Sequence, residues 1–407
     1  SIILLTLYLK AFIIQNMQAG IGISSAQDHI RAAKEAVEKA KRGMSGKNIK
    51  FAFVFSTGEF CHSLVLETIT DLIGHVSLIG ASSKAIICNQ GSLRQGLMVI
   101  LFDLAENIYF NTACVKDIGA ETTLTAGEEL GEKLLYGCKN LHRNLSVIFS
   151  NTNAVYNSNF INGLQERLGS SFPLVGASIT DHKASGLYFD TEILNNAACG
   201  ILWGGKLNFN LEIEHGWQPL GKPRYVTRSQ GGIVNEIDGA PAANLYKEYF
   251  AKEIPELRGE LGRLSVFYPL GLRISEQKEY LLRSIVAIEN DGSLVFRGEV
   301  PPGSPVRLMI SSKEACLSSA GNVAKAALKN AGGKKIKFAF ILNSLSRNTL
   351  LGRLAGQEIK VIQDVLGADV PLAGIYTSAE QAPLNSVNYL GKTYFHNNSI
   401  ALLTITD

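Results

Sequence analysis

The sequence predicts an α/β protein in which one strand–helix–strand unit occurs at least three times. Three apolar runs, at residues 51–56, 145–150 and 338–343, show no alternation of polar and apolar residues, which is typical of strands buried on both faces of a sheet. A helical segment and a second short strand with a glycine near its end follow each run. We therefore expect an α/β fold with mixed (α+β) sheets: two domains of repeated strand–helix–strand units with added β-hairpins, assembled as a layered sandwich.

Helices and hairpins surround these units. Apolar residues recur at helical spacing over residues 25–41, and helical segments at 120–137 and 313–330 lead into the second and third units. Between the second and third units, glycine-containing turns at 231–232 and 290–292 separate short apolar runs. Such turns between apolar runs are typical of β-hairpins.

The chain of 407 residues has room for two domains or slightly more. We place the boundary near Gly239, which gives domains at residues 17–239 and 240–407. Residues 1–16 form an apolar N-terminal extension, shorter than the about 20 residues that a membrane-spanning helix needs. Because Met17 opens a more conventional stretch, the sequence does not decide whether this extension belongs to the native protein.

Charge and cysteine content restrict the partners. The 39 basic and 36 acidic residues nearly cancel, so charge favours neither nucleic acid nor an anionic membrane as a partner. None of the six cysteines belongs to a Cys-x-x-Cys pair, and none is followed by a histidine at metal-ligand spacing. We therefore expect buried thiols in a reducing compartment, no metal site, no membrane span and a cytoplasmic location.

The usual signatures of catalysis and of nucleotide binding are absent from the sequence. It contains neither a Gly-x-Ser-x-Gly elbow nor His-Glu-x-x-His, and no complete Gly-x-x-x-x-Gly-Lys-Ser/Thr phosphate loop. Ser82 and Ser178 each follow Gly-Ala, but a tight turn explains small residues there. The sequence thus predicts a binding protein with no catalytic residues, and an enzyme with an unrecognised site is the alternative.

Candidate ligand contacts lie near the strand ends of the third unit, since ligands of open α/β sheets sit beyond the carboxyl ends of the strands. Arg347 and Glu380 are expected to hold the carboxylate and ammonium groups of an amino-acid-like ligand, Arg347 through its bidentate fork. The alternative is a structural ion pair between two loops. Tyr376 is a candidate for stacking on the ligand or hydrogen bonding to it, and the alternative is a core aromatic residue.

A series of short motifs resembles the FIST family, in the order in which that family has them. The N-terminal part of the resemblance includes Ile213-Glu-His-Gly-Trp-Gln-Pro-Leu-Gly-Lys-Pro223, Val226-Thr-Arg-Ser-Gln-Gly231 and Glu236-Ile-Asp-Gly239. The C-terminal part includes Tyr268-Pro-Leu-Gly271, Glu279-Tyr-Leu-Leu-Arg283, Asp291-Gly-Ser-Leu-Val-Phe296, Val306-Arg-Leu-Met309, Leu372-Ala-Gly-Ile-Tyr376, Glu380, Ala382-Pro383 and Phe395-His-Asn397. The order and number of these motifs, over residues 17–407, carry the resemblance.

The resemblance implies FIST N-terminal and C-terminal regions and a sensory role in intracellular signal transduction. It implies a small-molecule ligand, with amino acids or related metabolites among the suggestions. It also implies a signalling partner, such as a kinase, a cyclic-nucleotide enzyme or a chemoreceptor. Some family members are haem-binding nitric oxide sensors, so haem is the alternative cofactor. His396 and Asn397 are candidate ligand contacts, and His396 would be the axial ligand of a haem; the alternative for His396 is a structural histidine.

This sequence departs from the family pattern at three positions near the expected site. Ala81 stands where relatives often have cysteine, and Ala379 stands where they have glycine. Ser344 takes the place of a cysteine that is common before the family's arginine, here Arg347. We include Ser344 among the candidate ligand contacts, and the sequence leaves ligand identity open.

Overall fold

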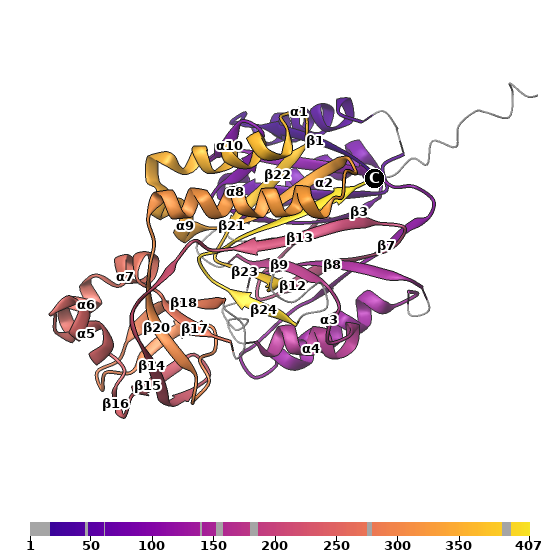
Figure 1. The fold of residues 1–407 in the computed structure, drawn as a ribbon. Coiled ribbons are helices and arrows are strands. Elements are labelled where there is room, and N and C mark those ends of the chain that lie inside the picture. Colours follow the sequence, from indigo (N-terminus) through magenta and orange to yellow (C-terminus); the bar gives the residue numbers. More distant parts are fainter. Residues whose placement is uncertain are drawn as a thin grey trace, which may run out of the picture.

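The computed structural model describes residues 17–44, 48–60, 62–138, 141–151, 158–179, 186–274, 279–384 and 392–407. The N-terminal extension over residues 1–16 lies outside the described residues. Within these residues the strands form four sheets, and three of them are mixed sheets of six strands. Helices cover the outer sides of the mixed sheets (Figure 1). The predicted α/β class with mixed sheets is therefore confirmed.

The first mixed sheet contains one parallel strand pair, β2–β3, and its other neighbours are antiparallel. Its strands in spatial order are β1 (Gln18–Ser24), β6 (Leu97–Asp103), β2 (Phe51–Thr57), β3 (Ser77–Ser83), β10 (Leu187–Phe189) and β11 (Glu192–Leu194). Helices α1 (His29–Arg42) and α2 (Ser63–Ile73) pack on its outer face, and the short 3-10 helix η1 (Gly58–Phe60) follows β2. Helix α1 begins at Asp28, whose carboxylate accepts a hydrogen bond from the amide of Arg31.

The second mixed sheet has the same arrangement of strands, with β8–β9 as its parallel pair. Its strands in spatial order are β24 (Thr393–His396), β23 (Ala379–Pro383), β9 (Leu174–Ser178), β8 (Arg143–Ser150), β12 (Ala198–Gly205) and β7 (Ile108–Val115). Helices α3 (Thr123–Leu135) and α4 (Asn159–Leu168) cover its outer face. Helix α4 is the helical segment expected after the apolar run at residues 145–150.

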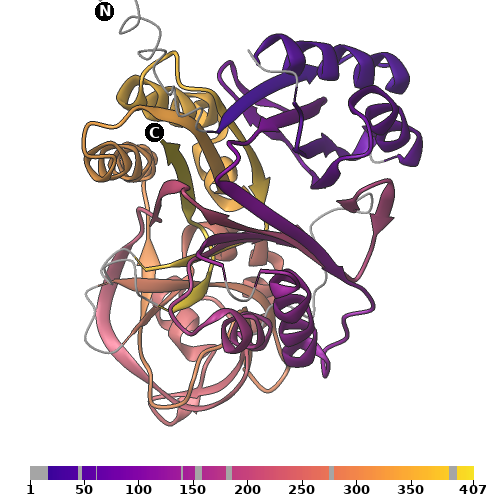
Figure 2. The same ribbon diagram turned by 90° about the vertical axis from the view of Figure 1, so that its right-hand side faces the viewer.

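The third mixed sheet repeats this arrangement around the parallel pair β21–β22. Its strands in spatial order are β13 (Asn208–Glu214), β25 (Ile400–Thr406), β21 (Ile336–Ser344), β22 (Leu372–Thr377), β4 (Ile86–Cys88) and β5 (Gly91–Leu93). Its outer helices are α8 (Lys313–Asn330), α9 (Leu345–Leu351), the 3-10 helix η3 (Gly352–Leu354) and α10 (Ala355–Leu366). Figure 2 shows the helices of the three sheets placed around the strands between them.

Each mixed sheet is completed at one edge by a hairpin that follows, in the chain, a strand of another mixed sheet. The hairpin β4–β5 follows β3 in the chain but pairs with β22 of the third sheet. The hairpin β10–β11 follows β9 but pairs with β3, and β23–β24 follows β22 but pairs with β9. The exchange is therefore cyclic: the hairpin that follows the parallel pair of the first sheet joins the third, that of the second joins the first, and that of the third joins the second. As a result Glu380, which the sequence suggests to lie in a loop of the third unit, is part of a strand of the second sheet.

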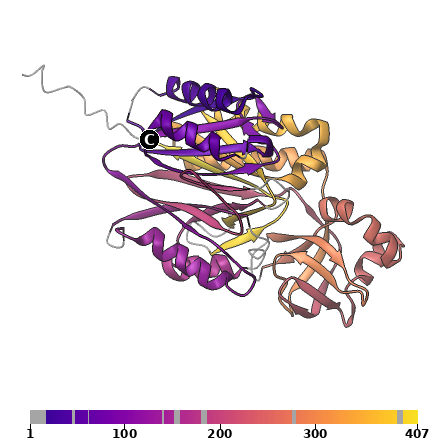
Figure 3. The same ribbon diagram turned by 180° about the vertical axis from the view of Figure 1, so that it is seen from behind.

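A separate antiparallel sheet is inserted between β13 and α8, and we call residues 218–310 the inserted domain. Its strands in spatial order are β14 (Gln218–Gln230), β20 (Pro305–Ile310), β17 (Leu270–Arg273), β18 (Tyr280–Ile288), β19 (Leu294–Arg297), β15 (Ile233–Ile237) and β16 (Ala240–Pro241). The helices α5 (Asn244–Phe250), α6 (Ile254–Gly259) and α7 (Leu261–Phe267) pack against it. Both predicted hairpins, β14–β15 and β18–β19, are confirmed. Figure 3 shows the inserted domain projecting from the body of the three mixed sheets.

The inner faces of the three mixed sheets enclose one apolar core. Phe53 of the first sheet contacts Phe149 of the second and Phe340 of the third, with ring centroids 6.1 and 5.8 Å apart. Aromatic rings at such separations contribute more than their buried area alone. The core therefore holds three sheets together by contacts between residues far apart in the sequence.

Glycines allow the parallel strands to pack closely at corresponding points of the three sheets. A Cβ atom on Gly80, Gly176 or Gly374 would lie 1.7, 2.4 or 2.3 Å from a carbonyl oxygen of the neighbouring strand. These glycines thus serve close backbone approach, as the sequence suggests. Among the described residues, no helix has the length and apolar character that crossing a membrane requires.

Candidate functional site

The carboxyl ends of the parallel strands carry the same backbone contact in all three mixed sheets. The residue at or just after the end of the first strand of each pair donates its amide to the carbonyl of the residue before the antiparallel neighbour of that strand, which is β6, β12 or β25. The three bonds are Thr57 to Gly96 (2.9 Å), Asn151 to Ala197 (3.1 Å) and Ser344 to Ser399 (3.0 Å). These positions are therefore structurally equivalent, and their side chains can be compared directly.

The side chains at these positions differ in the third sheet. Thr57 and Asn151 accept hydrogen bonds from the amides of Gly96 and Ala197 at 3.0 and 3.1 Å. The equivalent amide of Ser399 instead donates to a carboxylate oxygen of Glu380 at 3.2 Å. Glu380 thus performs at the third sheet a role that a neutral side chain performs at the other two.

Glu380 places a carboxyl group at a position that is apolar in the other two sheets. It is 0 % exposed, and it pairs with Ala177 in the β23–β9 ladder. The corresponding residues of the other two hairpins are Leu187 and Ile86, which are both part of the central core. Burial raises the pKa of Glu380 to about 8, although hydrogen bonds from the hydroxyl of Thr377 and from the Ser399 amide oppose this shift.

Arg347 does not form an ion pair with Glu380. It is 0 % exposed, and its ion pair is with the equally buried Glu358 of α10, through Nε at 2.9 Å. A second bond joins Nη2 to the same carboxylate oxygen, and Nη2 also donates to the carbonyl of Cys316 at 2.7 Å. Nη1 donates to the carbonyl of His215 at 2.6 Å and to Ser319 Oγ at 3.1 Å. All five N–H groups of the guanidinium are therefore occupied by protein.

Tyr376 and Ser344 also take part in the structure of the third sheet. Tyr376 is buried in the apolar layer between this sheet and its outer helices, where burial raises the pKa of its hydroxyl to about 12. Ser344 caps α9, because its hydroxyl accepts a hydrogen bond from the amide of Ser346 at 3.3 Å. Arg347 and Tyr376 thus lie on the helix-covered side of the sheet, whereas Glu380 lies on its inner side.

His396 and Asn397 lie close to Glu380 in space. His396 is directly opposite Glu380 in the β23–β24 ladder, so both side chains point to the same face. Its Nε2 lies 3.0 Å from the carbonyl of Ala382, and burial lowers the pKa of the imidazole to about 3. Asn397 accepts a hydrogen bond from the amide of Ser284 at 2.9 Å, which ties the inserted domain to β24.

A pocket of about 430 Å³ opens at this point, between the third sheet and the inserted domain. Residues at the end of β13, at the start of β18 and on both sides of the turn between β24 and β25 line it. The polar and aromatic residues among them include Glu214, His215, Trp217, Tyr280, His396 and Ser399. Sequence reasoning placed only His396 here. His215 and Trp217 belong to the longest of the family-like motifs, residues 213–223, and this position was the only indication of a role for them. Without the family resemblance, that motif indicates only a connecting segment.

The described side chains that line this pocket are acidic or neutral, and none of them is an arginine or a lysine. Burial raises the pKa of Glu214 and lowers that of His215 to about 4, and the nearby charge of Arg347 adds to the effect on His215. In the described part of the chain, no group of three or more His, Cys, Asp or Glu side chains is arranged to hold a metal ion.

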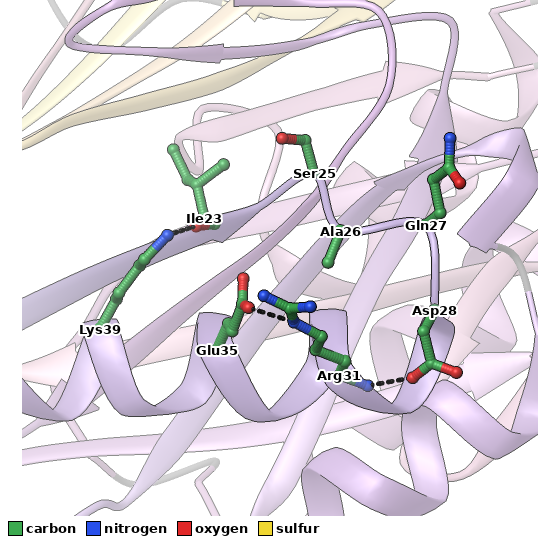
Figure 4. A pocket seen from close by; sticks show the side chains of 8 residues that line it. All are labelled: Ile23, Ser25, Ala26, Gln27, Asp28, Arg31, Glu35 and Lys39. Carbon is green, nitrogen blue, oxygen red and sulfur yellow. Dashed lines mark hydrogen bonds and ion pairs between the residues drawn. The ribbon is translucent and has the colours of Figure 1, made fainter.

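A second, open pocket lies beside the N-terminus of α1 and is less suited to hold a ligand. Its charged side chains, shown in Figure 4, are already engaged with one another or with the backbone. Arg31 pairs with Glu35 at 2.8 Å, and Lys39 donates to the carbonyl of Ile23 at 2.8 Å. These contacts stabilise the exposed side of the helix.

The molecule is thus an α/β protein with three corresponding mixed sheets, one inserted antiparallel domain and a polar pocket where they meet. Sequence comparison identifies the class. The FIST N domain matches residues 50–240 and the FIST C domain matches residues 242–383. The chain therefore belongs to the FIST family, whose domains are associated with sensory signal transduction.

The curated relatives are uncharacterised. A protein of Mycobacterium tuberculosis (strain ATCC 25618 / H37Rv) is 23% identical over 389 residues, which cover 92% of this chain and 97% of the relative. One of Methanocaldococcus jannaschii is 24% identical over 258 residues, covering 57% of this chain and 48% of the relative. A solved cyanuric acid hydrolase from A. caulinodans covers 95% of this chain and 98% of its own, with 8% identity and a TM-score of 0.40. A similarity this distant supports no conclusion about this chain.

Proposed function

We propose that this protein is a sensor that binds a small molecule in the pocket between the third sheet and the inserted domain. The supporting observation is the difference between the three equivalent strand ends. Within the described residues, only the strand end of the third sheet has a buried carboxyl group beside it together with an imidazole on the same face. These groups belong to Glu380 and His396. The volume of about 430 Å³ is within the range of small-molecule sites.

The lining favours a ligand that carries a positive charge or several hydrogen-bond donors. Glu214 contributes a carboxyl group, and the two imidazoles, His215 and His396, are neutral at pH 7. Trp217 and Tyr280 add aromatic surface, which attracts ammonium groups. An amine, or the amino group of an amino acid, matches this chemistry. The carboxylate of an amino acid would have to find donors other than Arg347, whose N–H groups are occupied.

The same contacts support binding rather than catalysis. The hydroxyl of Ser399 donates to the carbonyl of Asn397 at 3.0 Å, and His396 Nε2 faces the carbonyl of Ala382. Serine and histidine are therefore not arranged as nucleophile and base. The residues also do not fit a haem, because the Nε2 atom that would bind iron is engaged with the backbone.

In this proposal the inserted domain responds to the ligand and a partner protein receives the signal. The pocket includes Tyr280 of the inserted domain, and Asn397 joins this domain to the strand next to Glu380. A ligand in the pocket therefore contacts both parts of the molecule. A kinase, a cyclic-nucleotide enzyme or a chemoreceptor would suit the sensory role of the family.

Thermal unfolding in the presence of amines and amino acids tests the proposal. A ligand that binds only the folded state raises Tm in a concentration-dependent way. The variant Tyr280→Ala removes aromatic surface from the pocket and is expected to lose most of the shift. The matched control is Tyr136→Ala, because Tyr136 is 84 % exposed and lies far from the pocket residues in sequence and in the fold. The proposal is wrong if no compound shifts the wild type, or if both variants respond as the wild type does.

A further inference from the structure

A further pocket, of about 300 Å³, lies between the inserted domain, β24 and the N-terminus of α4. Among the described residues it shares no lining residue with the pocket discussed above. Its described lining has three cationic side chains, Arg273, Arg283 and Lys392, and one carboxylate, that of Glu299. We call it the basic cavity.

Arg283 is the central cation of the basic cavity. It is 3 % exposed, and its guanidinium packs against the backbone of Gly298. Nε donates to the carbonyl of Glu299 at 2.8 Å, and Nη1 donates to those of Leu282 and Phe395 at 3.0 and 2.9 Å. Nη2 donates no hydrogen bond, and Arg283 has no ion-pair partner in the part of the chain that the structure describes. A buried cation in this state is costly unless an anion joins it.

Two further groups at the basic cavity are suited to an anion. Thr393 is 1 % exposed, and its hydroxyl has no hydrogen-bond partner among the described residues. A buried hydroxyl without a partner costs free energy, which a ligand oxygen would recover. Ser158, at the N-cap of the ten-residue helix α4, lines the same space. The positive end of the helix dipole therefore lies beside it.

We propose that the basic cavity binds the phosphate or carboxylate group of a small molecule, held by Arg283, Thr393 and the N-terminus of α4. The bound group would join the inserted domain, which supplies Arg283, to the second mixed sheet, which supplies Thr393. This site is independent of the pocket proposed for the sensed ligand, since the two have no residue in common.

The test compares thermal unfolding in phosphate or acetate with unfolding in sodium chloride of the same ionic strength. The variant Thr393→Val removes the hydroxyl and keeps the shape of the side chain. The matched control is Thr404→Val, because Thr404 of β25 is also buried, also has a hydroxyl without a partner, and is not among the cavity residues. In chloride, both variants are expected to be as stable as the wild type or more so, since each loses an unsatisfied hydroxyl.

Phosphate or acetate is expected to raise Tm of the wild type and of Thr404→Val equally. Thr393→Val is expected to lose at least half of that rise, and the double variant Arg273→Ala/Lys392→Ala is expected to bind the anion several-fold more weakly. Protection by acetate as well as phosphate would assign carboxylate ligands to the site, and protection by phosphate alone would assign phosphate ligands. Equal protection of all variants, or no protection by either anion, would overturn the proposal.

Discussion

The buried carboxyl group of Glu380 makes the stability of the protein depend on pH in a way that one substitution removes. Its pKa of about 8 in the folded protein compares with an ordinary value of 4.5. Between these values the folded protein holds a proton on Glu380 that the unfolded chain has lost. The free energy of unfolding therefore falls as pH rises, by about 1.4 kcal/mol per pH unit at most.

The window from pH 6.5 to 8 covers much of this effect. The pKa values of His215 and His396 are lowered to about 4 and about 3, so both imidazoles are neutral in the folded protein, whereas those of the unfolded chain are still half protonated at pH 6.5. Their contribution to stability therefore rises by about 0.4 kcal/mol each over the window, and it is the same in every variant that keeps both histidines. Over the same window the Glu380 effect amounts to a loss of about 1.5 kcal/mol.

Urea unfolding at pH 6.5 and pH 8 measures the difference. Glu380→Gln keeps an oxygen that accepts from the Ser399 amide but has no titrating proton, so this loss is expected to disappear. The control Glu129→Gln, at a half-exposed side chain of α3, is expected to keep it. If Glu380→Gln loses stability between pH 6.5 and 8 as the wild type does, another group titrates and the reasoning is refuted.

Two further predictions concern contacts around the pocket. Arg347→Met leaves the carboxylate of Glu358 buried without its cation and is expected to cost about 3–5 kcal/mol in urea unfolding. Arg347→Met/Glu358→Met should recover most of this, and a double variant as unstable as the sum of both single ones would contradict a structural ion pair. Asn397→Ala removes the acceptor for the Ser284 amide and is expected to cost about 1–3 kcal/mol. Hydrogen exchange at that amide should accelerate, and unchanged exchange would show that this contact does not hold the inserted domain.

Local features of the fold could be predicted from the sequence because they depend on short-range patterns. Helix α8 at residues 313–330 and both hairpin turns of the inserted domain agree with the prediction. The strands 51–56, 145–150 and 338–343 are correct because continuous apolar runs are typical of buried parallel strands. Each of these signals lies within about twenty residues.

The candidate site was harder to predict because its contacts cross between sheets. The segment Ala379–Pro383 has no apolar alternation, so nothing in it indicates a strand, least of all one paired with β9. Arg347 has two acids near it in the fold, and its ion-pair partner, Glu358, is not among the residues that the sequence analysis singles out. Charge alone could not select between Glu358 and Glu380, since the choice depends on which face of the third sheet each side chain occupies.

The exchange of hairpins brings the buried polar residues Glu380 and Arg347 to the place where the second sheet, the third sheet and the inserted domain meet. Because β23–β24 pairs with the second sheet while β25 belongs to the third, the turn at residues 397–399 connects two sheets and also contacts the inserted domain. Glu380 accepts a hydrogen bond from the Ser399 amide of this turn. Arg347 donates to the carbonyl of His215, which lines the pocket beside the turn. A ligand that changes the hydrogen bond between Glu380 and the Ser399 amide would therefore act on a turn that all three parts share. Such a ligand shifts the population between two arrangements of this turn to the extent that it binds one of them more tightly.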